Sequence, residues 1–251
     1  MEQMVCLSGL PRSGSTLLSA ILSQNPLIHA EGNSAVCQFI WDIHQSGTLH
    51  ASEQLHGNNR TKTVGDMIQA VPRIYYKDVP ATKKIIVDKC RSWTIAANVE
   101  LLKKYIDPHI KIIVLERSVE AIMKSFMKLY VKNNWPTEKI NATLKALLTP
   151  GAEPIMRSIY GINLAKKNNA QQNFLFIQYD DLIAQPAETL QRIYTFCGWA
   201  PYAHDFQQVV NTHPENDAYY GLKDFHTIRA TVGKEENTVV LPADIGGLLP
   251  P

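Results

Sequence analysis

The chain contains 251 residues, of which 45% are apolar and 19% charged, and its formal net charge is +2. This size and composition support one substantial core and exclude an intrinsically disordered protein. No run approaches the ~20 apolar residues of a membrane span, no secretory signal precedes the first strand, and the small net charge does not suggest a nucleic-acid partner. Four widely spaced cysteines favour reduced thiols over a zinc site or disulfides, so we expect a cytoplasmic protein.

Short apolar segments alternate with helical patterns along the chain. The apolar segments predict buried strands at residues 4–10, 83–89, 111–117 and 173–182. A helical pattern follows each of them, at residues 15–25, 94–105, 118–131 and 186–199. This alternation is typical of βα units built around a parallel sheet. In the last helix, Pro186 suits the first turn and Gly198 suits the C-terminal cap.

Two stretches carry additional helical patterns, at residues 34–76 and 133–170, and we expect them to be insertions that cover the ligand edge of the sheet. After about residue 199 the periodicity weakens into loops and short helices. We therefore predict a single domain over residues 1–251. Its fold class is α/β, a P-loop-like three-layer fold in which a central parallel sheet of four to five strands is flanked by helices.

Charge is distributed unevenly along the chain. Residues 80–132 contain 11 Lys and Arg against 5 Asp and Glu, a local charge of +6, whereas residues 177–251 contain 4 against 10, a local charge of −6. The basic middle can attract an anionic ligand, although solvated helix faces would give the same count.

The first strand runs into the sequence "GLPRSGST" at residues 9–16. A turn that contains glycines and leads into a helix directs free backbone N–H groups and the helix dipole at one point, which makes an anion site. The spacing is close to that of the P-loop G-x-x-x-x-G-K-[ST], but Ser15 stands in place of the lysine that reaches the β- and γ-phosphates. The loop therefore favours a ligand whose 5′-phosphate is attached to a group with less negative charge than the β- and γ-phosphates of a triphosphate.

The stretch "PRSGSTLL" resembles the 5′-phosphosulfate-binding loop of sulfotransferases that use 3′-phosphoadenylyl sulfate (PAPS), most of all the tyrosylprotein and bacterial branches. The resemblance extends, with gaps, from Met4 to Trp199. It implies a sulfuryl transfer without a required metal. It also implies that the loop binds the donor through the residues Arg12, Ser13, Gly14, Ser15 and Thr16, with Arg12 also catalytic.

Three further stretches agree with this resemblance. "VLERSVEAIMKSF" resembles the second signature of the family, in which Arg117 and Ser125 would bind the 3′-phosphate of the donor. An arginine at the end of a strand presents a planar fork to phosphate, although Arg117 could instead pair with Glu116 or Glu120. "IIVDKC" places Lys89 where the family has a catalytic lysine or histidine. "FIQYDDL" resembles a late strand whose tyrosine, Tyr179, would contact the donor.

The late sequence "YGLKDFHTIRATVGK" offers basic residues that could complete the 3′-phosphate site, and Arg229 and Lys234 are the candidates. The stretch does not match the late glycine-rich motif of the family.

The sequence offers several candidates for the general base that accepts the acceptor proton. Tyrosylprotein sulfotransferases carry a carboxylate shortly after the first helix, and Glu31 is the nearest one, although ungapped counting from the loop reaches Asn33. We take Glu31 as the candidate base, with His29, His44 and His226 as alternatives.

The sequence therefore predicts transfer of a sulfuryl group from PAPS to an acceptor hydroxyl or amine by in-line displacement, with release of adenosine 3′,5′-bisphosphate (PAP). The acceptor could be a small molecule, a sugar, a lipid or a peptide. Two alternatives stay open, a P-loop kinase or NTPase, for which Asp88 would imitate a magnesium ligand, and a non-catalytic nucleotide-binding module. The sequence does not indicate the oligomeric state.

Overall fold

The computed structural model describes residues 1–168, 172–234 and 238–250. Its centre is a five-stranded sheet in which each adjacent pair of strands is parallel, in the order β2-β3-β1-β4-β5. The strands are β1 (Gln3–Gly9), β2 (Ile28–Asn33), β3 (Ile85–Lys89), β4 (Lys111–Glu116) and β5 (Phe174–Gln178). The predicted α/β class and parallel sheet are thus confirmed, and β2, which contains Glu31, is the fifth strand.

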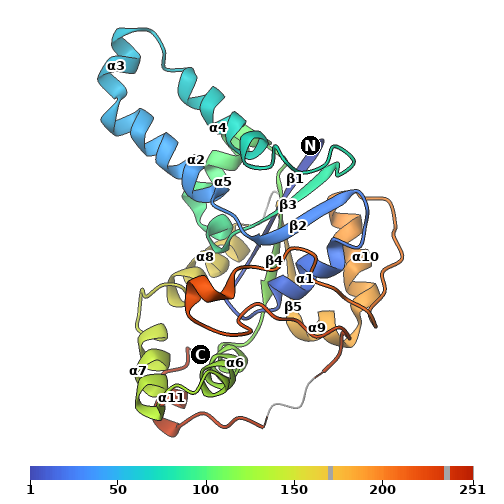
Figure 1. Cartoon of the computed structure of the whole chain (residues 1–251). Helices are drawn as coiled ribbons and strands as arrows, with labels where there is room; N and C mark the ends of the chain where they lie inside the picture. The colour runs from blue at the N-terminus through green and yellow to red at the C-terminus, as the bar shows by residue number, and fades with distance from the viewer. Residues whose placement is uncertain (169–171, 235–237, 251) are drawn as a thin grey trace.

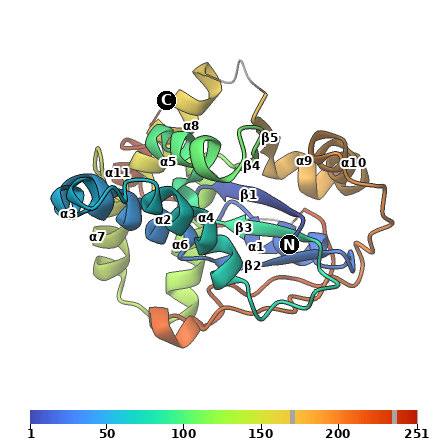
Figure 2. The same ribbon diagram turned by 90° about the horizontal axis from the view of Figure 1, so that it is seen from above.

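Helices cover both faces of this sheet (Figure 1; Figure 2). The α-helices are α1 (Ser15–Leu22), α2 (Val36–Gln45), α3 (Ser52–Gly57), α4 (Thr63–Tyr75), α5 (Ala96–Leu101), α6 (Val119–Lys132), α7 (Thr137–Leu147), α8 (Met156–Lys167), α9 (Tyr179–Ala184), α10 (Pro186–Cys197) and α11 (Ala243–Gly246). Short 3₁₀ or π turns occur at η1 (Ser46–His50), η2 (Arg91–Thr94), η3 (Leu102–Ile106) and η5 (Asp217–Tyr220). None of the helices in the described ranges is long and apolar enough to cross a membrane.

Two hydrophobic cores lie on the two faces of the sheet because both faces of its central strand are buried. In β1, Met4 and Cys6 belong to the core beneath α2, α4, α5, α6 and α8, whereas Val5 and Leu7 belong to the core beneath α1, α9 and α10. Alternate residues of a strand point to opposite faces, so an unbroken apolar run serves both cores. This explains why β1 reads as a continuous apolar segment.

The two predicted insertions are helical as far as the structure describes them. Residues 34–76 form α2, α3 and α4, which project from the body as a hairpin (Figure 1). Residues 133–168 contain α7 and α8, and the last two positions of the predicted insertion, 169 and 170, lie outside the described residues. In α10, Pro186 occupies the first turn and Gly198 is a left-handed cap with φ +71°, as the sequence predicted.

The strand order places the functional groups. The chain moves from β1 outward to β2, returns through β3, and continues to β4 on the other side of β1, so the connections diverge at β1. Ligands of open α/β sheets bind at the carboxyl ends of strands at such a point. The register puts Lys89 beside Leu7 and Leu115 beside Gly9. The loop after β1, the end of β3 and the residues after β4 therefore meet.

The segment after α10 contains little regular structure, as predicted, and folds back on itself. Val209 N–H donates to the Ala230 carbonyl, and Val232 N–H donates to the Phe206 carbonyl. Val209 and Val232 are buried in the core of the α1 face. Residues 206–232 are therefore anchored to the body rather than free, and they return to the carboxyl edge of the sheet.

Candidate active site

The loop at residues 9–16 is shaped by two glycines that have no room for a side chain. A Cβ added to Gly9 would lie 2.4 Å from the Leu115 carbonyl oxygen, and one added to Gly14 would lie 2.5 Å from the Tyr179 ring. Gly14 also adopts φ +94° at the N-cap of α1, where no side chain caps the helix. The first N–H groups of α1 consequently keep their capacity to bind an anion.

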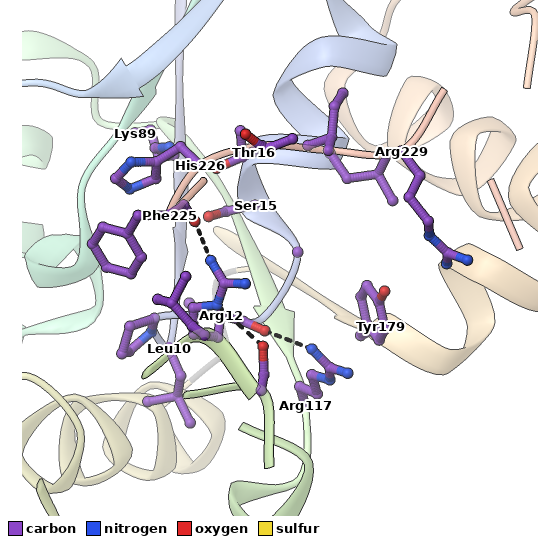
Figure 3. Close-up of a pocket in the computed structure, with 18 of the residues that line it drawn as sticks. Leu10, Arg12, Ser15, Thr16, Lys89, Arg117, Tyr179, Phe225, His226 and Arg229 are labelled. Carbon is purple, nitrogen blue, oxygen red and sulfur yellow. Dashed lines mark hydrogen bonds between the residues drawn. The ribbon is translucent and has the colours of Figure 1, made fainter. Parts of the chain in front are cut away.

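A cavity of about 510 Å³ opens over this loop (Figure 3). Among the described residues, its lining contains eight Lys and Arg side chains against Asp180 and Asp224. The basic residues are Arg12, Lys89, Arg91, Arg117, Lys128, Lys132, Arg229 and Lys234. They come from the loop, the end of β3, η2, the connection between β4 and α6, α6 itself and the late segment. Their number indicates an anionic ligand of several charges.

Arg12 lines the cavity between the loop and the late segment. Its backbone is in the left-handed region with φ +61°, which is uncommon for a residue other than glycine. The guanidinium donates to Ser125 Oγ through Nε at 3.1 Å, and to the Phe225 carbonyl through Nη1. Burial lowers the pKa of Arg12 from its ordinary value, and the neighbouring Arg117 adds to this effect. Arg12 therefore links the loop to α6 and to the late segment.

Arg117 lies immediately after β4, one residue beyond the strand in which the sequence placed it. Its Nη1 donates to the Arg12 carbonyl at 2.9 Å, and its Cζ lies 4.3 Å from the centroid of the Tyr179 ring. Neither acidic neighbour binds it, because Glu116 pairs with Lys166 and Glu120 pairs with Lys124. The alternative in which Arg117 pairs with one of these acids is therefore wrong.

Two buried polar atoms at the loop have no partner among the described residues. They are Ser13 Oγ and Arg117 Nε. Buried polar groups are nearly always hydrogen-bonded, so an orphaned donor at a cavity signals a missing acceptor. Ser13 is fully buried below the loop, and Ser15 and Thr16 line the cavity at the start of α1.

Lys89 is buried at the end of β3 and lines the cavity. Burial lowers its pKa, whereas the Glu215 carboxylate, 2.8 Å from Nζ, acts in the opposite direction. The preceding residue, Asp88, points into the opposite core, where it accepts hydrogen bonds from Tyr76 and Trp93 at 2.7 Å each. Asp88 is fully buried and does not line the cavity, so it does not stand where a magnesium ligand would be needed.

The candidate bases lie in different places. Glu31 bonds to His29 at 3.0 Å, which is the main cause of its lowered pKa, and neither residue lines the cavity, although Asn33 does. His44 lies in α2 of the helical insertion, where its ring is 6.5 Å from that of Tyr105 in η3. His226 alone of the four candidates lines the cavity.

The two late basic candidates both line the cavity. Arg229 Nη2 donates to the Gly233 carbonyl at 2.6 Å, which closes the turn between them, and Lys234 is exposed. Figure 3 shows Arg229 on the same side of the cavity as Tyr179 and Arg117.

Residues 5–204 match the model of the sulfotransferase family, and this match covers more than half of the chain. The chain belongs to the sulfotransferase family. Its chemistry is therefore the transfer of a sulfuryl group. No curated protein matches the sequence significantly.

Solved sulfotransferases share the fold at low sequence identity. The sulfotransferase domain of the Synechococcus PCC 7002 olefin synthase is 21% identical, with a TM-score of 0.52 over 98% of this chain and 92% of that one. The sulfotransferase domain of the curacin biosynthetic pathway is 17% identical, with a TM-score of 0.52 over 84% and 78%. A sulfotransferase from Alicyclobacillus acidocaldarius is 13% identical, with a TM-score of 0.54 over 86% and 87%.

Sequence reasoning missed two carboxylates of this sulfotransferase, Glu215 and Asp217. Glu215 binds Lys89, and Asp217 binds His226 at 2.7 Å. Both lie beyond the end of the family match at residue 204, in a segment without periodicity. The sequence indicates them only as two acidic residues about ten positions before His226, and such a pair does not by itself mark a site.

Proposed function

We propose that this sulfotransferase transfers the sulfuryl group of PAPS to an acceptor hydroxyl or amine and releases PAP. The observation that carries the proposal is the cavity itself. It brings an uncapped helix N-terminus together with Arg117, Lys89 and the late basic residues, although these groups are far apart in the sequence.

The loop fits the 5′ end of such a donor. The N–H groups at the start of α1 and the hydroxyl groups of Ser13, Ser15 and Thr16 would donate to the 5′-phosphate and the sulfuryl oxygens. Ser15 and Thr16 line the cavity, whereas Ser13 Oγ is buried beneath the loop and has no partner among the described residues. Ser15 stands where a P-loop has the lysine that neutralises the β- and γ-phosphates. A 5′-phosphosulfate needs that lysine less, because it carries less negative charge than a triphosphate.

Arg117 would bind the 3′-phosphate. Its Nε is buried and has no partner among the described residues, while Nη1 donates to the Arg12 carbonyl and the guanidinium lies near the Tyr179 ring. An arginine fixed in this way presents its remaining donors in a defined direction. Ser125 would assist through its hydroxyl, and Arg229 or Lys234 would close the site from the late segment.

Two residues are placed to stabilise charge during the transfer. Lys89, at the end of β3, would donate to the bridging oxygen as negative charge develops on it, and Arg12 would support the charge on the phosphate. The protein groups supply all of these positive charges, so we expect the reaction to proceed without a metal ion.

The two alternative functions receive less support. A kinase would need a cation where Ser15 stands and a magnesium ligand near Asp88, whose carboxylate is instead bonded to Tyr76 and Trp93. An inert nucleotide-binding module would have no use for a buried lysine and a histidine at the reacting end of the cavity. The acceptor class stays open among small-molecule, sugar, lipid and peptide hydroxyls, and a cytoplasmic location stays a prediction.

The cavity should discriminate between nucleotides by the position of their phosphates. We expect PAP, titrated in the presence of EDTA, to bind at least ~10-fold more tightly than ATP does in a parallel titration with Mg²⁺. The reason is that the cavity offers arginines for a 3′-phosphate and no cation at the γ-phosphate position. Calorimetry measures both affinities. A higher affinity for ATP with Mg²⁺ would contradict the proposal. Transfer of labelled sulfate from PAPS to an added hydroxyl compound would exclude the inert module.

A further inference from the structure

Four ionisable side chains form a chain of contacts at one side of the cavity. Lys89 Nζ lies 2.8 Å from Glu215 Oε1, Glu215 Oε2 lies 3.5 Å from His226 Nε2, and His226 Nδ1 lies 2.7 Å from Asp217 Oδ1. Their side chains are only 6%, 10%, 15% and 21% exposed, respectively. Such a closely packed set of acids and bases is typical of a site of proton transfer.

The contacts of Asp217 determine the tautomer of His226. An ionised carboxylate only accepts hydrogen bonds, so the imidazole must donate to it through Nδ1–H. The second carboxylate oxygen accepts from the backbone N–H of His226 at 3.1 Å, which fixes the carboxylate as well. The imidazole is therefore held with the unprotonated Nε2 on the far side of the ring from Asp217, and the nearest Glu215 oxygen lies 3.5 Å from it.

His226 also stands where two hollows meet. It lines the donor cavity, and it lines a second hollow of about 320 Å³ whose other walls include Glu215, Asp217 and several apolar residues. Lys89 and the loop line only the first hollow. An in-line displacement needs the donor on one side of the sulfur and the acceptor on the other. His226 can reach a group that enters through the second hollow.

We propose that His226 is the catalytic base of this enzyme, with Asp217 as its positioning residue; the inference rests on the proposed function. The acceptor oxygen forms a bond to sulfur while the bond between sulfur and the bridging phosphate oxygen breaks. The acceptor proton passes to His226 Nε2. The electron pair of the broken bond stays on the bridging oxygen of PAP, next to the ammonium group of Lys89.

Glu215 serves both ends of this step. It holds the Lys89 ammonium group in place, and its second oxygen faces the nitrogen that becomes protonated, so it stabilises the imidazolium together with Asp217. Other charged or titratable neighbours among the described residues include Tyr220, whose ring lies 5.3 Å from that of His226, and Arg12, which contacts the adjoining Phe225. Arg91 lines the same cavity and acts electrostatically on both Lys89 and Tyr220. Glu31 is bound to His29 outside the cavity and does not compete for this role.

The experiment compares wild type with His226→Asn, Asp217→Asn and the control His109→Asn. Asparagine at 226 keeps a donor for Asp217 but removes Nε2, and His109 is exposed and remote from the cavity. Three quantities are measured: the Kd for PAP, the release of labelled sulfate from PAPS to water and to 2-naphthol between pH 5 and 9, and the nitrogen chemical shifts of His226.

We expect His226→Asn to lower transfer by about 100- to 10,000-fold and to abolish any rise of the transfer rate between pH 5 and 9, with the Kd for PAP within about 2-fold of wild type. Asp217→Asn should lower transfer by about 10-fold or more at an unchanged Kd and should mix the tautomers of His226. His109→Asn should match wild type in every measurement.

The inference would be overturned by equal transfer rates in wild type and His226→Asn at intact affinity for PAP. It would also be overturned by an Nε2–H tautomer in wild type, a result that does not depend on any acceptor. If wild type neither binds PAP nor transfers sulfate, the proposed function itself fails. The two failures are therefore distinguishable.

Discussion

At the scale of single residues, Arg117 occupies an unusual position for a charged side chain. It is partly buried, it bonds to a backbone carbonyl of the loop, and it lies over an aromatic ring. None of these partners is an acid, so no carboxylate among them would compete with an anionic ligand for the guanidinium. A side chain held in place before binding loses little entropy when the ligand arrives.

We therefore predict that Arg117→Ala weakens binding of PAP by about 10- to 100-fold, because a charge-assisted hydrogen bond to phosphate is lost. Binding of adenosine 5′-monophosphate should weaken by no more than about 3-fold, because the N–H groups of α1 stay in place. Calorimetry with both nucleotides measures the difference.

The matched control is Arg157→Ala, since Arg157 is exposed and pairs with Glu153 away from the cavity. It should leave both affinities unchanged. Equal weakening of the bisphosphate and the monophosphate in Arg117→Ala would remove Arg117 from the 3′-phosphate role.

At the scale of elements, α6 carries Ser125 to the floor of the cavity, and its first turn follows Arg117 directly. Ser118 caps the helix by accepting a hydrogen bond from the Ala121 N–H at 3.2 Å. The cap fixes where α6 begins and so how Ser125 is placed relative to Arg12. Ser118 itself is exposed, so its contribution to stability comes from capping and not from packing.

Ser118→Ala should lower the free energy of unfolding by about 1 kcal/mol, because one N–H group of the first turn loses its acceptor. The midpoint of urea unfolding, at a constant m-value, measures this change. Ser118→Thr keeps the hydroxyl group and should recover most of the loss. Equal midpoints for wild type and Ser118→Ala would show that the cap contributes nothing.

At the scale of the whole molecule, the cavity is assembled from the first residues of the sheet and from a segment more than 200 residues later. Arg12 bonds to the Phe225 carbonyl, and Lys89 binds Glu215. A ligand that contacts the loop and the late segment together should therefore stabilise both at once.

We predict that PAP at ~100 times its Kd stabilises the protein by about 2.7 kcal/mol and raises its melting temperature by about 5–10 °C. Hydrogen exchange should slow in residues 9–16 and 222–234, while the distal hairpin at residues 46–58 should not change. Protection confined to the loop would contradict binding across both segments.

Much of the site could be predicted from local patterns, because a parallel sheet brings the carboxyl ends of its strands to one edge. Once the strands were recognised, the loop, Lys89 and Arg117 had to lie near one another, and the register of β1 with β3 and β4 bears this out. Tyr179 follows the last strand and lies in the same cavity for the same reason.

The sequence by itself thus determined the α/β class, four of the five strands, the glycine-containing loop after the first strand and the family, since each depends on residues close together in the chain. Only the tertiary structure decided which late residues meet the sheet. Glu215, Asp217 and His226 lie in an aperiodic segment, and their positions depend on how that segment folds back against Lys89. Without periodicity or strand register, no local pattern fixes such a contact, because long-range packing alone determines it.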